Sequence, residues 1–129
     1  MKIAALDIGG TSIKSGIWNG HSMEETGEIA TNAKNGGPYV IQRAIEILRS
    51  YSGFEAIGIS TAGQVDSQKG IIRYANENIP NYTGMPIRQI LEETFGVPIA
   101  VENDVNELTK MGEIDRVGGA AYLMDISSQ

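Results

Sequence analysis

Three short stretches combine glycine or turn residues with carboxylates, amides and hydroxyls: DIGGT (7–11), STAGQVD (60–66) and VENDVN (101–106). Each one follows an apolar run that is typical of a strand. In α/β folds, ligands bind at the carboxyl ends of strands, where helix N-termini also supply a positive dipole. The three stretches are therefore the candidate functional loops of this chain.

The first stretch allows two interpretations. It can be a tight hairpin in which Asp7 caps the turn and the glycines supply positive φ. Alternatively, the N–H groups of Gly9, Gly10 and Thr11 cradle a phosphate, with the Thr11 hydroxyl as a further donor and Asp7 near a hydrated Mg²⁺. The spacing matches neither a Walker loop nor a dinucleotide fingerprint, because the turn leads into a strand and not into a helix.

The other two stretches also have a simple structural alternative. VENDVN can be a helix cap at a strand end, and STAGQVD can be a turn with Gly63 at positive φ. Three consecutive polar groups exceed the needs of one cap. A carboxylate there could accept the proton of an attacking hydroxyl, with Asp104 as the candidate base, while Asn103 holds neighbouring hydroxyls. Gly63 would then line the substrate.

The elements that must position these loops alternate between strands and helices after an initial meander. Periodicity and turn residues predict strands at 2–8, 12–18, 25–31, 54–60, 69–75, 97–103 and 118–128, and helices at 39–51, 86–96 and 104–113. Gly96 is expected to close the second helix. The pattern predicts an α/β sandwich with a mixed sheet.

Composition limits the classes of protein and partner. The chain has 129 residues, a formal net charge of -6 and no cysteine. The length suits one domain, and the acidity argues against nucleic acid or an anionic membrane surface as partner. No disulfide or thiolate zinc site can form within the chain. No apolar run approaches the roughly 20 residues of a membrane span, so we expect a cytoplasmic protein.

LDIGGTSIKSG, GISTAGQVD and ENIPNYTGMPIRQILEETFGVPIAVENDVN, in this order and spacing, resemble the N-terminal half of the ROK family of bacterial sugar kinases. The resemblance covers about 2–113. It implies a ribonuclease-H-like (actin-like ATPase) α/β domain with a three-strand meander, a mixed sheet and helices on both faces. It also implies ATP-dependent phosphorylation of a hexose or hexosamine.

The resemblance assigns roles to individual residues. It implies that Asp104 is the catalytic base and that Asn103 and Gly63 bind the sugar. Asp7, Gly9, Gly10 and Thr11 would face the ATP phosphates and Mg²⁺, with Asp7 as the metal ligand. Ala62 stands where the family usually has proline, which would leave that loop looser.

ROK kinases have a second, C-terminal domain that completes the ATP and sugar sites, and nothing in this sequence resembles it. We therefore expect residues 1–129 to form one N-terminal domain without measurable kinase activity on its own. Homodimerisation, or self-association through the face left by the second domain, is a further expectation.

Two other function classes stay open. ROK-like proteins include sugar-sensing transcriptional repressors, but those carry a helix-turn-helix before the sugar domain, whereas this sequence starts in its first strand. A nucleotide-binding actin-like domain without sugar chemistry is the third class, and the residues 101–106 argue against it. In the loop at 77–86, Asn78 and Tyr82 are weaker candidates for ligand contact.

Overall fold

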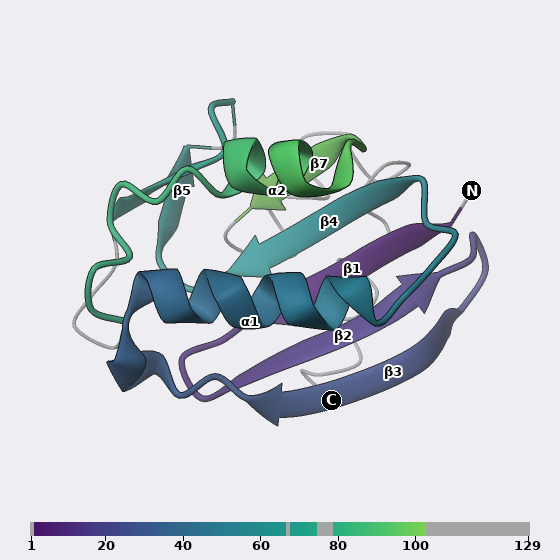
Figure 1. Cartoon of the computed structure of the whole chain (residues 1–129), viewed down its shortest axis with the longest axis horizontal. Coiled ribbons are helices and arrows are strands. Elements are labelled where there is room, and N and C mark those ends of the chain that lie inside the picture. Colours follow the sequence, from purple (N-terminus) through teal and green to yellow (C-terminus); the bar gives the residue numbers. More distant parts are fainter. Residues whose placement is uncertain (1, 67, 75–78, 103–129) are drawn as a thin grey trace.

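The computed structural model describes residues 2–66, 68–74 and 79–102, which form a five-stranded mixed sheet, a two-stranded sheet and the helices on them (Figure 1). The five-stranded sheet has the order β3-β2-β1-β4-β7, and the smaller sheet pairs β5 with β6. The bounds are β1 Ile3–Ile8, β2 Ser12–Trp18, β3 Met23–Ala30, η1 Ala33–Asn35, α1 Gly37–Arg49, β4 Ala56–Thr61, β5 Gln64–Asp66, β6 Ile71–Tyr74, α2 Ile87–Phe95 and β7 Ile99–Glu102.

The predicted meander is confirmed. β1 pairs with β2 and β2 with β3, in both cases antiparallel, whereas β4 runs parallel to β1 and β7 runs parallel to β4. The parallel strands β1, β4 and β7 therefore end at the same edge of the sheet. The β1–β2 turn and the loop after β4 both leave the sheet at this edge.

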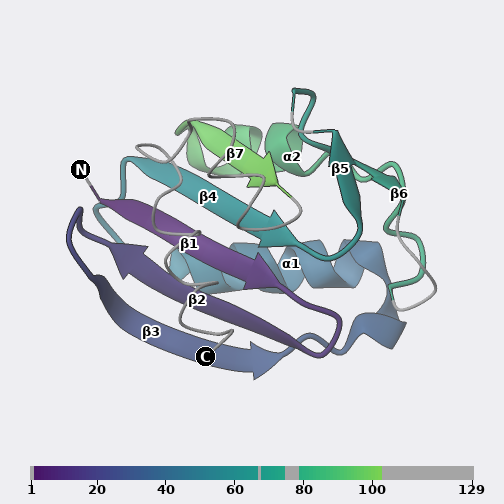
Figure 2. The same ribbon diagram turned by 180° about the vertical axis from the view of Figure 1, so that it is seen from behind.

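Both described helices cover the same face of the sheet, as the front and back views show (Figures 1 and 2). Each has the hydrophobic spacing of an amphipathic helix, with Val40, Ala44 and Leu48 buried on α1 and Ile87 and Leu91 buried on α2. The expected helix at 104–113 and strand at 118–128 lie outside the described residues. The expectation of a single domain over 1–129 stays a prediction.

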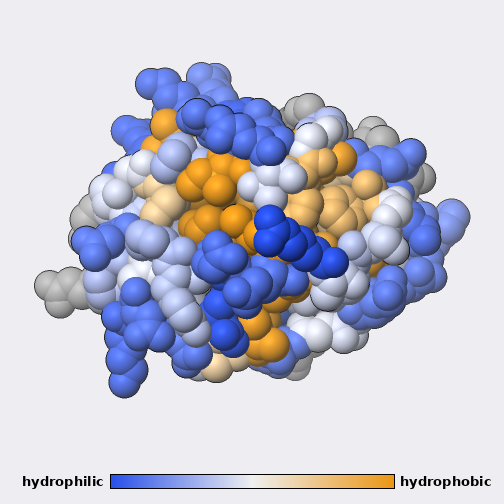
Figure 3. Space-filling model, in the orientation of Figure 1, coloured by the Kyte–Doolittle hydropathy of each residue, from blue (hydrophilic) through white to orange (hydrophobic). Residues whose placement is uncertain are grey.

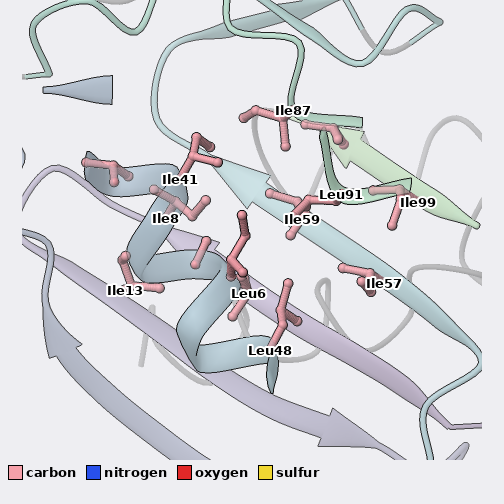
Figure 4. Packing of buried hydrophobic residues seen from close by; sticks show 14 of the residues in the cluster. Leu6, Ile8, Ile13, Ile41, Leu48, Ile57, Ile59, Ile87, Leu91 and Ile99 are labelled. Atoms are coloured by element: carbon pink, nitrogen blue, oxygen red, sulfur yellow. The ribbon is translucent and has the colours of Figure 1, made fainter. Parts of the chain in front are cut away.

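One apolar cluster joins the helices to the sheet (Figure 4). On β1, Ala4, Leu6 and Ile8 belong to it, while the intervening Asp7 is only partly buried. Successive strand residues point to opposite faces, so this alternation assigns Asp7 to the face opposite the helices. The other members labelled in Figure 4 are Ile13, Ile41, Leu48, Ile57, Ile59, Ile87, Leu91 and Ile99.

The element boundaries differ from the predicted ones by a few residues for local reasons. α1 starts at Gly37 and ends at Arg49, after which the Ser50 and Tyr51 N–H groups still donate to Ile47 and Leu48. These tighter i→i+3 bonds are typical of a helix end. As expected, Gly96 closes α2 with φ of 68° and donates to the Glu92 carbonyl at 2.8 Å.

The stretch 60–66 contains the expected turn and, after it, a short strand of the two-stranded sheet. Gly63 does have a positive φ of 94°, but Gln64–Asp66 forms β5, which pairs with β6. A short strand of three residues gives too little period-2 pattern to be recognised in sequence. The β excursion predicted at 69–75 is confirmed as β6.

The loop at 77–86, a weaker candidate for ligand contact, contributes Tyr82 to the core. Tyr82 is fully buried, and its hydroxyl lies 2.7 Å from the Thr61 hydroxyl at the end of β4. Burial raises the pKa of Tyr82 well above its usual range. The prediction that Tyr82 contacts ligand was therefore wrong, while Asn78 lies outside the described residues.

Apolar surface lies between α1 and α2 in the view of Figure 3, with polar residues above and below it. Phe54, Ile90 and Phe95 are among the partly buried apolar residues that pack against the core. Self-association stays a prediction. Among the described residues, no helix combines the length and apolar character needed to cross a membrane.

Gly37 lies where helix α1 begins, against the backbone of the loop before α2. Its N–H donates to the Pro80 carbonyl at 2.7 Å, and a Cβ at Gly37 would lie 2.5 Å from the Asn81 carbonyl oxygen.

We expect Gly37→Ala to lower the free energy of unfolding by about 1–3 kcal/mol, as overpacking does. The measurement is urea unfolding. Gln42→Ala, at an exposed position of the same helix, is the control and should change stability by less than about 0.5 kcal/mol; equal stability of both variants would contradict this packing argument.

Candidate active site

The edge of the sheet where β1 and β4 end holds the first two candidate loops side by side. Ile8 pairs with Thr61 in the parallel ladder, and the Ala62 N–H donates to the Ile8 carbonyl at 2.8 Å. This bond brings DIGGT and STAGQVD together, although they lie far apart in sequence. β7 ends at Glu102, whose ladder partner on β4 is Ser60. Asn103 and Asp104, the candidate sugar and base residues, lie outside the described residues.

The DIGGT stretch forms a hairpin turn, and its geometry corrects two expectations. The Gly9 N–H donates to the Ser12 carbonyl at 2.9 Å, so it closes the hairpin and is not available to a phosphate. Neither Gly9 nor Gly10 has a positive φ. A close approach favours glycine at position 9, because a Cβ there would lie 3.0 Å from the Ser12 carbonyl oxygen.

The remaining donors of this turn are exposed. Among the described residues, no backbone hydrogen bond uses the N–H of Gly10 or Thr11. Both residues are exposed, and both line a pocket of about 460 Å³ together with Asn32, Ala33 and Lys34. The turn therefore presents N–H groups and one hydroxyl to an open pocket, which is a set of donors that suits an anion.

Thr31 fixes the two walls of this pocket to each other. Its N–H donates to the Thr11 carbonyl at 2.9 Å, and its hydroxyl donates to the Gly9 carbonyl at 2.8 Å. The side chain is fully buried. The connection from β3 to α1 is thus held against the hairpin turn through both backbone and side chain.

Asp7 lies one residue before this turn, on the sheet face opposite the helices. Its ladder partners are Lys14 on β2 and Ser60 on β4. Burial raises the pKa of Asp7, and the positive charge of Lys14 opposes that rise. A partly desolvated carboxylate in this setting gains from a nearby cation. The hairpin register, with its two-residue period, places Lys14 beside Asp7 on the same face of the sheet.

Tyr39 and Arg43 lie on the first turns of α1 and contact each other. The Arg43 guanidinium donates to the Tyr39 hydroxyl at 3.1 Å and lies 5.6 Å from the centre of the ring. A hydrogen bond from Asn32 is the main cause that lowers the pKa of Tyr39, with Arg43 and Asn35 contributing. These contacts connect the pocket residue Asn32 to the start of helix α1.

The ROK family model matches residues 3–116. The chain belongs to the ROK family. The ROK-family β-glucoside kinase of Klebsiella pneumoniae is 32% identical over 111 residues, which are 82% of this chain and 35% of that protein. The glucokinase of Thermotoga maritima is 32% identical over 115 residues, which cover 82% of this chain and 34% of the enzyme.

Solved ROK structures have the same fold. The ROK hexokinase from Thermus thermophilus is 38% identical with a TM-score of 0.73, over 82% of this chain and 36% of that chain. A ROK glucokinase from Streptomyces griseus, in complex with glucose and AMPPNP, is 27% identical with a TM-score of 0.72, over 82% of this chain and 34% of that one. The actin-like ATPase fold expected from the sequence is therefore confirmed.

The chain is shorter than these relatives, and one structural neighbour is a transcriptional regulator. The chain spans about a third of the length of the ROK relatives named above. A ROK transcriptional regulator, a homolog of the E. coli Mlc protein, is 18% identical with a TM-score of 0.70 and shares the fold alone. Membership of the ROK family thus establishes the fold of this chain and its similarity to sugar kinases. The roles of its individual site residues stay proposals.

The partly buried Asp7 carboxylate predicts how stability depends on pH. The folded-state pKa lies above the ordinary value of 3.8, so the folded chain binds more protons than the unfolded chain between these two values. Stability therefore falls as pH rises through that interval. We expect Asp7→Asn to be more heat-stable than the unchanged chain at pH 7 and to lose this advantage near pH 3.5, when melting temperatures are measured in EDTA.

Glu55→Gln, at an exposed position before β4, is the control for removal of a carboxylate. The difference in melting temperature between Glu55→Gln and the unchanged chain should vary little between pH 7 and pH 3.5. An advantage of Asp7→Asn that grows as the pH is lowered would contradict the assignment, because it would mean that the folded state stabilises the ionised carboxylate.

Proposed function

We propose that this chain supplies the phosphate-binding part of an ATP-dependent sugar kinase that transfers the γ-phosphate to a hydroxyl of a hexose or hexosamine. The observation that carries the proposal is the hairpin turn at the end of β1. Its residues Gly10 and Thr11 line a pocket, their N–H groups make no backbone hydrogen bond in the described residues, and Gly10 lies three residues after the partly buried Asp7. The ROK relatives, a β-glucoside kinase and a glucokinase, support the same reaction class.

The proposed chemistry is positioning and charge stabilisation. Phosphoryl transfer needs donors around the phosphate oxygens and an acceptor hydroxyl in line with the breaking bond. The Gly10 and Thr11 N–H groups and the Thr11 hydroxyl would hold the phosphate oxygens. Asp104 would accept the proton of the sugar hydroxyl, while Asn103 and Gly63 would orient the sugar.

The carboxylate oxygens of Asp7 are the type of ligand that a magnesium ion prefers. Mg²⁺ takes oxygen ligands, and in phosphoryl-transfer sites it is held by one or two carboxylates together with substrate phosphates. Within residues 2–66, 68–74 and 79–102, no group of three metal-ligating side chains occurs. Asp7 would hold Mg²⁺ together with the ATP phosphates, and the ion would compensate their negative charge.

The kinase proposal can be tested in a chimera in which residues 3–116 replace the matching segment of the Thermus thermophilus ROK hexokinase. We expect sugar-dependent ADP release in a coupled assay across hexoses and hexosamines. Asp104→Asn should reduce turnover by about 10²–10⁴-fold, the typical contribution of a general base, while sugar affinity stays within a few-fold. Turnover unchanged by Asp104→Asn would refute its role as base. Sugar binding without any phosphorylation would favour a sensor.

The phosphate loop can be tested in the same chimera with Gly10→Val. A branched side chain at this exposed position would cover the N–H and block the approach of a phosphate, so the KM for ATP should rise at least about tenfold while the KM for sugar changes little. Gly27→Val, on the exposed strand β3, is the matched control because a Cβ there meets only the Ser15 hydroxyl at 3.6 Å. Equal losses for both ligands would indicate general misfolding and contradict a specific phosphate role.

A further inference from the structure

The pocket beside the hairpin turn has a second wall that the sequence did not indicate. Gly10 and Thr11 form one side, and Asn32, Ala33 and Lys34 form the other. The second wall comes from the start of η1, the short turn that follows β3 in Figure 1. The volume of about 460 Å³ lies within the usual range of small-molecule sites.

The residues that line this pocket carry positive charge only. Lys34 is exposed and is the only charged residue among the five that line it. Two acidic side chains lie close to the turn without lining the pocket: Asp7 on β1, and Glu28, whose carboxylate accepts a hydrogen bond of 2.8 Å from the Ser12 hydroxyl. With the N–H groups of Gly10 and Thr11, the ammonium group makes the lining a set of hydrogen-bond donors with a net positive charge.

The second wall is held in place by contacts that do not involve Lys34 itself. Thr31 bonds to the Gly9 and Thr11 carbonyls, and Gly37 bonds to the Pro80 carbonyl on the other side of η1. Asn32 adopts the left-handed conformation with φ of 52°, which asparagine tolerates better than most residues. The backbone that carries Lys34 is thus fixed at both ends, so the Lys34 side chain extends from a fixed point in the wall of the pocket.

We propose that Lys34 is a substrate-binding residue that contacts the triphosphate of the phosphate donor in this pocket. The proposal rests on the kinase function proposed above and adds a charged contact to it. Lysine acts as a point charge toward phosphate, and its three donors can follow the phosphate oxygens as the γ-phosphate moves toward the sugar. The recognised chemistry is a linear chain of phosphates, whether it is carried by a nucleotide or is free.

The 129-residue chain is suited to a direct binding test by NMR. Inorganic triphosphate, MgATP and adenosine are titrated separately into the ¹⁵N-labelled chain. We expect triphosphate and MgATP to shift the amide resonances of Gly10, Thr11 and Lys34, and adenosine to leave them unchanged. Lys34→Ala should weaken triphosphate binding by about five- to tenfold, since a surface charge contact to an anion contributes on the order of 1 kcal/mol, and Lys34→Arg should restore most of the affinity.

Lys69→Ala is the matched control, because Lys69 is also an exposed loop lysine but does not line the pocket. It should bind triphosphate like the unchanged chain. Melting temperatures of the three lysine variants show whether any loss comes from unfolding. Triphosphate binding that is unchanged by Lys34→Ala would overturn the proposal, as would shifts caused by adenosine alone, or no binding of triphosphate at all.

Failure of this proposal and failure of the kinase function give different results. In the hexokinase chimera, Lys34→Ala should raise the KM for ATP about five- to tenfold without a change in the KM for sugar. An active chimera that does not respond to Lys34→Ala would overturn the role of Lys34 and leave the kinase proposal intact. An inactive chimera with Lys34-dependent triphosphate binding in the isolated chain would leave the anion site intact and refute the kinase.

Discussion

The alternation of side chains along β1 is the constraint on which the rest of this structure depends. Leu6 and Ile8 point into the cluster beneath α1, so the two-residue period places Asp7 on the other face of the sheet. A shift of one residue would bury the carboxylate among apolar side chains and remove both hydrophobic residues from the cluster. The free energy of core packing therefore also fixes the position of the candidate metal ligand.

The same strand determines where the loops meet. Because β4 runs parallel to β1, the strands end together, and the bond from Ala62 to Ile8 joins the loops that follow them. The antiparallel return into β2 makes the phosphate loop a hairpin. Thr31 then brings the connection after β3 against this hairpin. Strand register, rather than a helix N-terminus, thus creates the donor-lined pocket.

The family relationship and the geometry support each other at different scales. The ROK match over residues 3–116 and the solved ROK structures establish the actin-like fold. The local geometry reduces the number of candidate phosphate donors. The Gly9 N–H bonds within the hairpin, whereas Gly10 and Thr11 line the pocket. A kinase built in this way would depend on loop positions that the sheet holds rigidly, as phosphoryl transfer requires.

The sequence by itself determined the order of the long elements, the hairpin at DIGGT and the end of α2 at Gly96, because local periodicity and turn residues encode them. It also indicated Asp7, Gly10 and Thr11 as phosphate-site candidates, whereas Asn103 and Asp104 were suggested by residue type and family resemblance and stay predictions. Only the tertiary structure decided that Tyr82 belongs to the core, that the Gly9 N–H closes a turn, and that Lys34 lines the pocket. The first and the third depend on contacts between segments distant in sequence, whose pairing is set by packing and sheet register and leaves no local periodic signal. The Gly9 bond to Ser12 spans only three residues and depends on the backbone conformation of the turn.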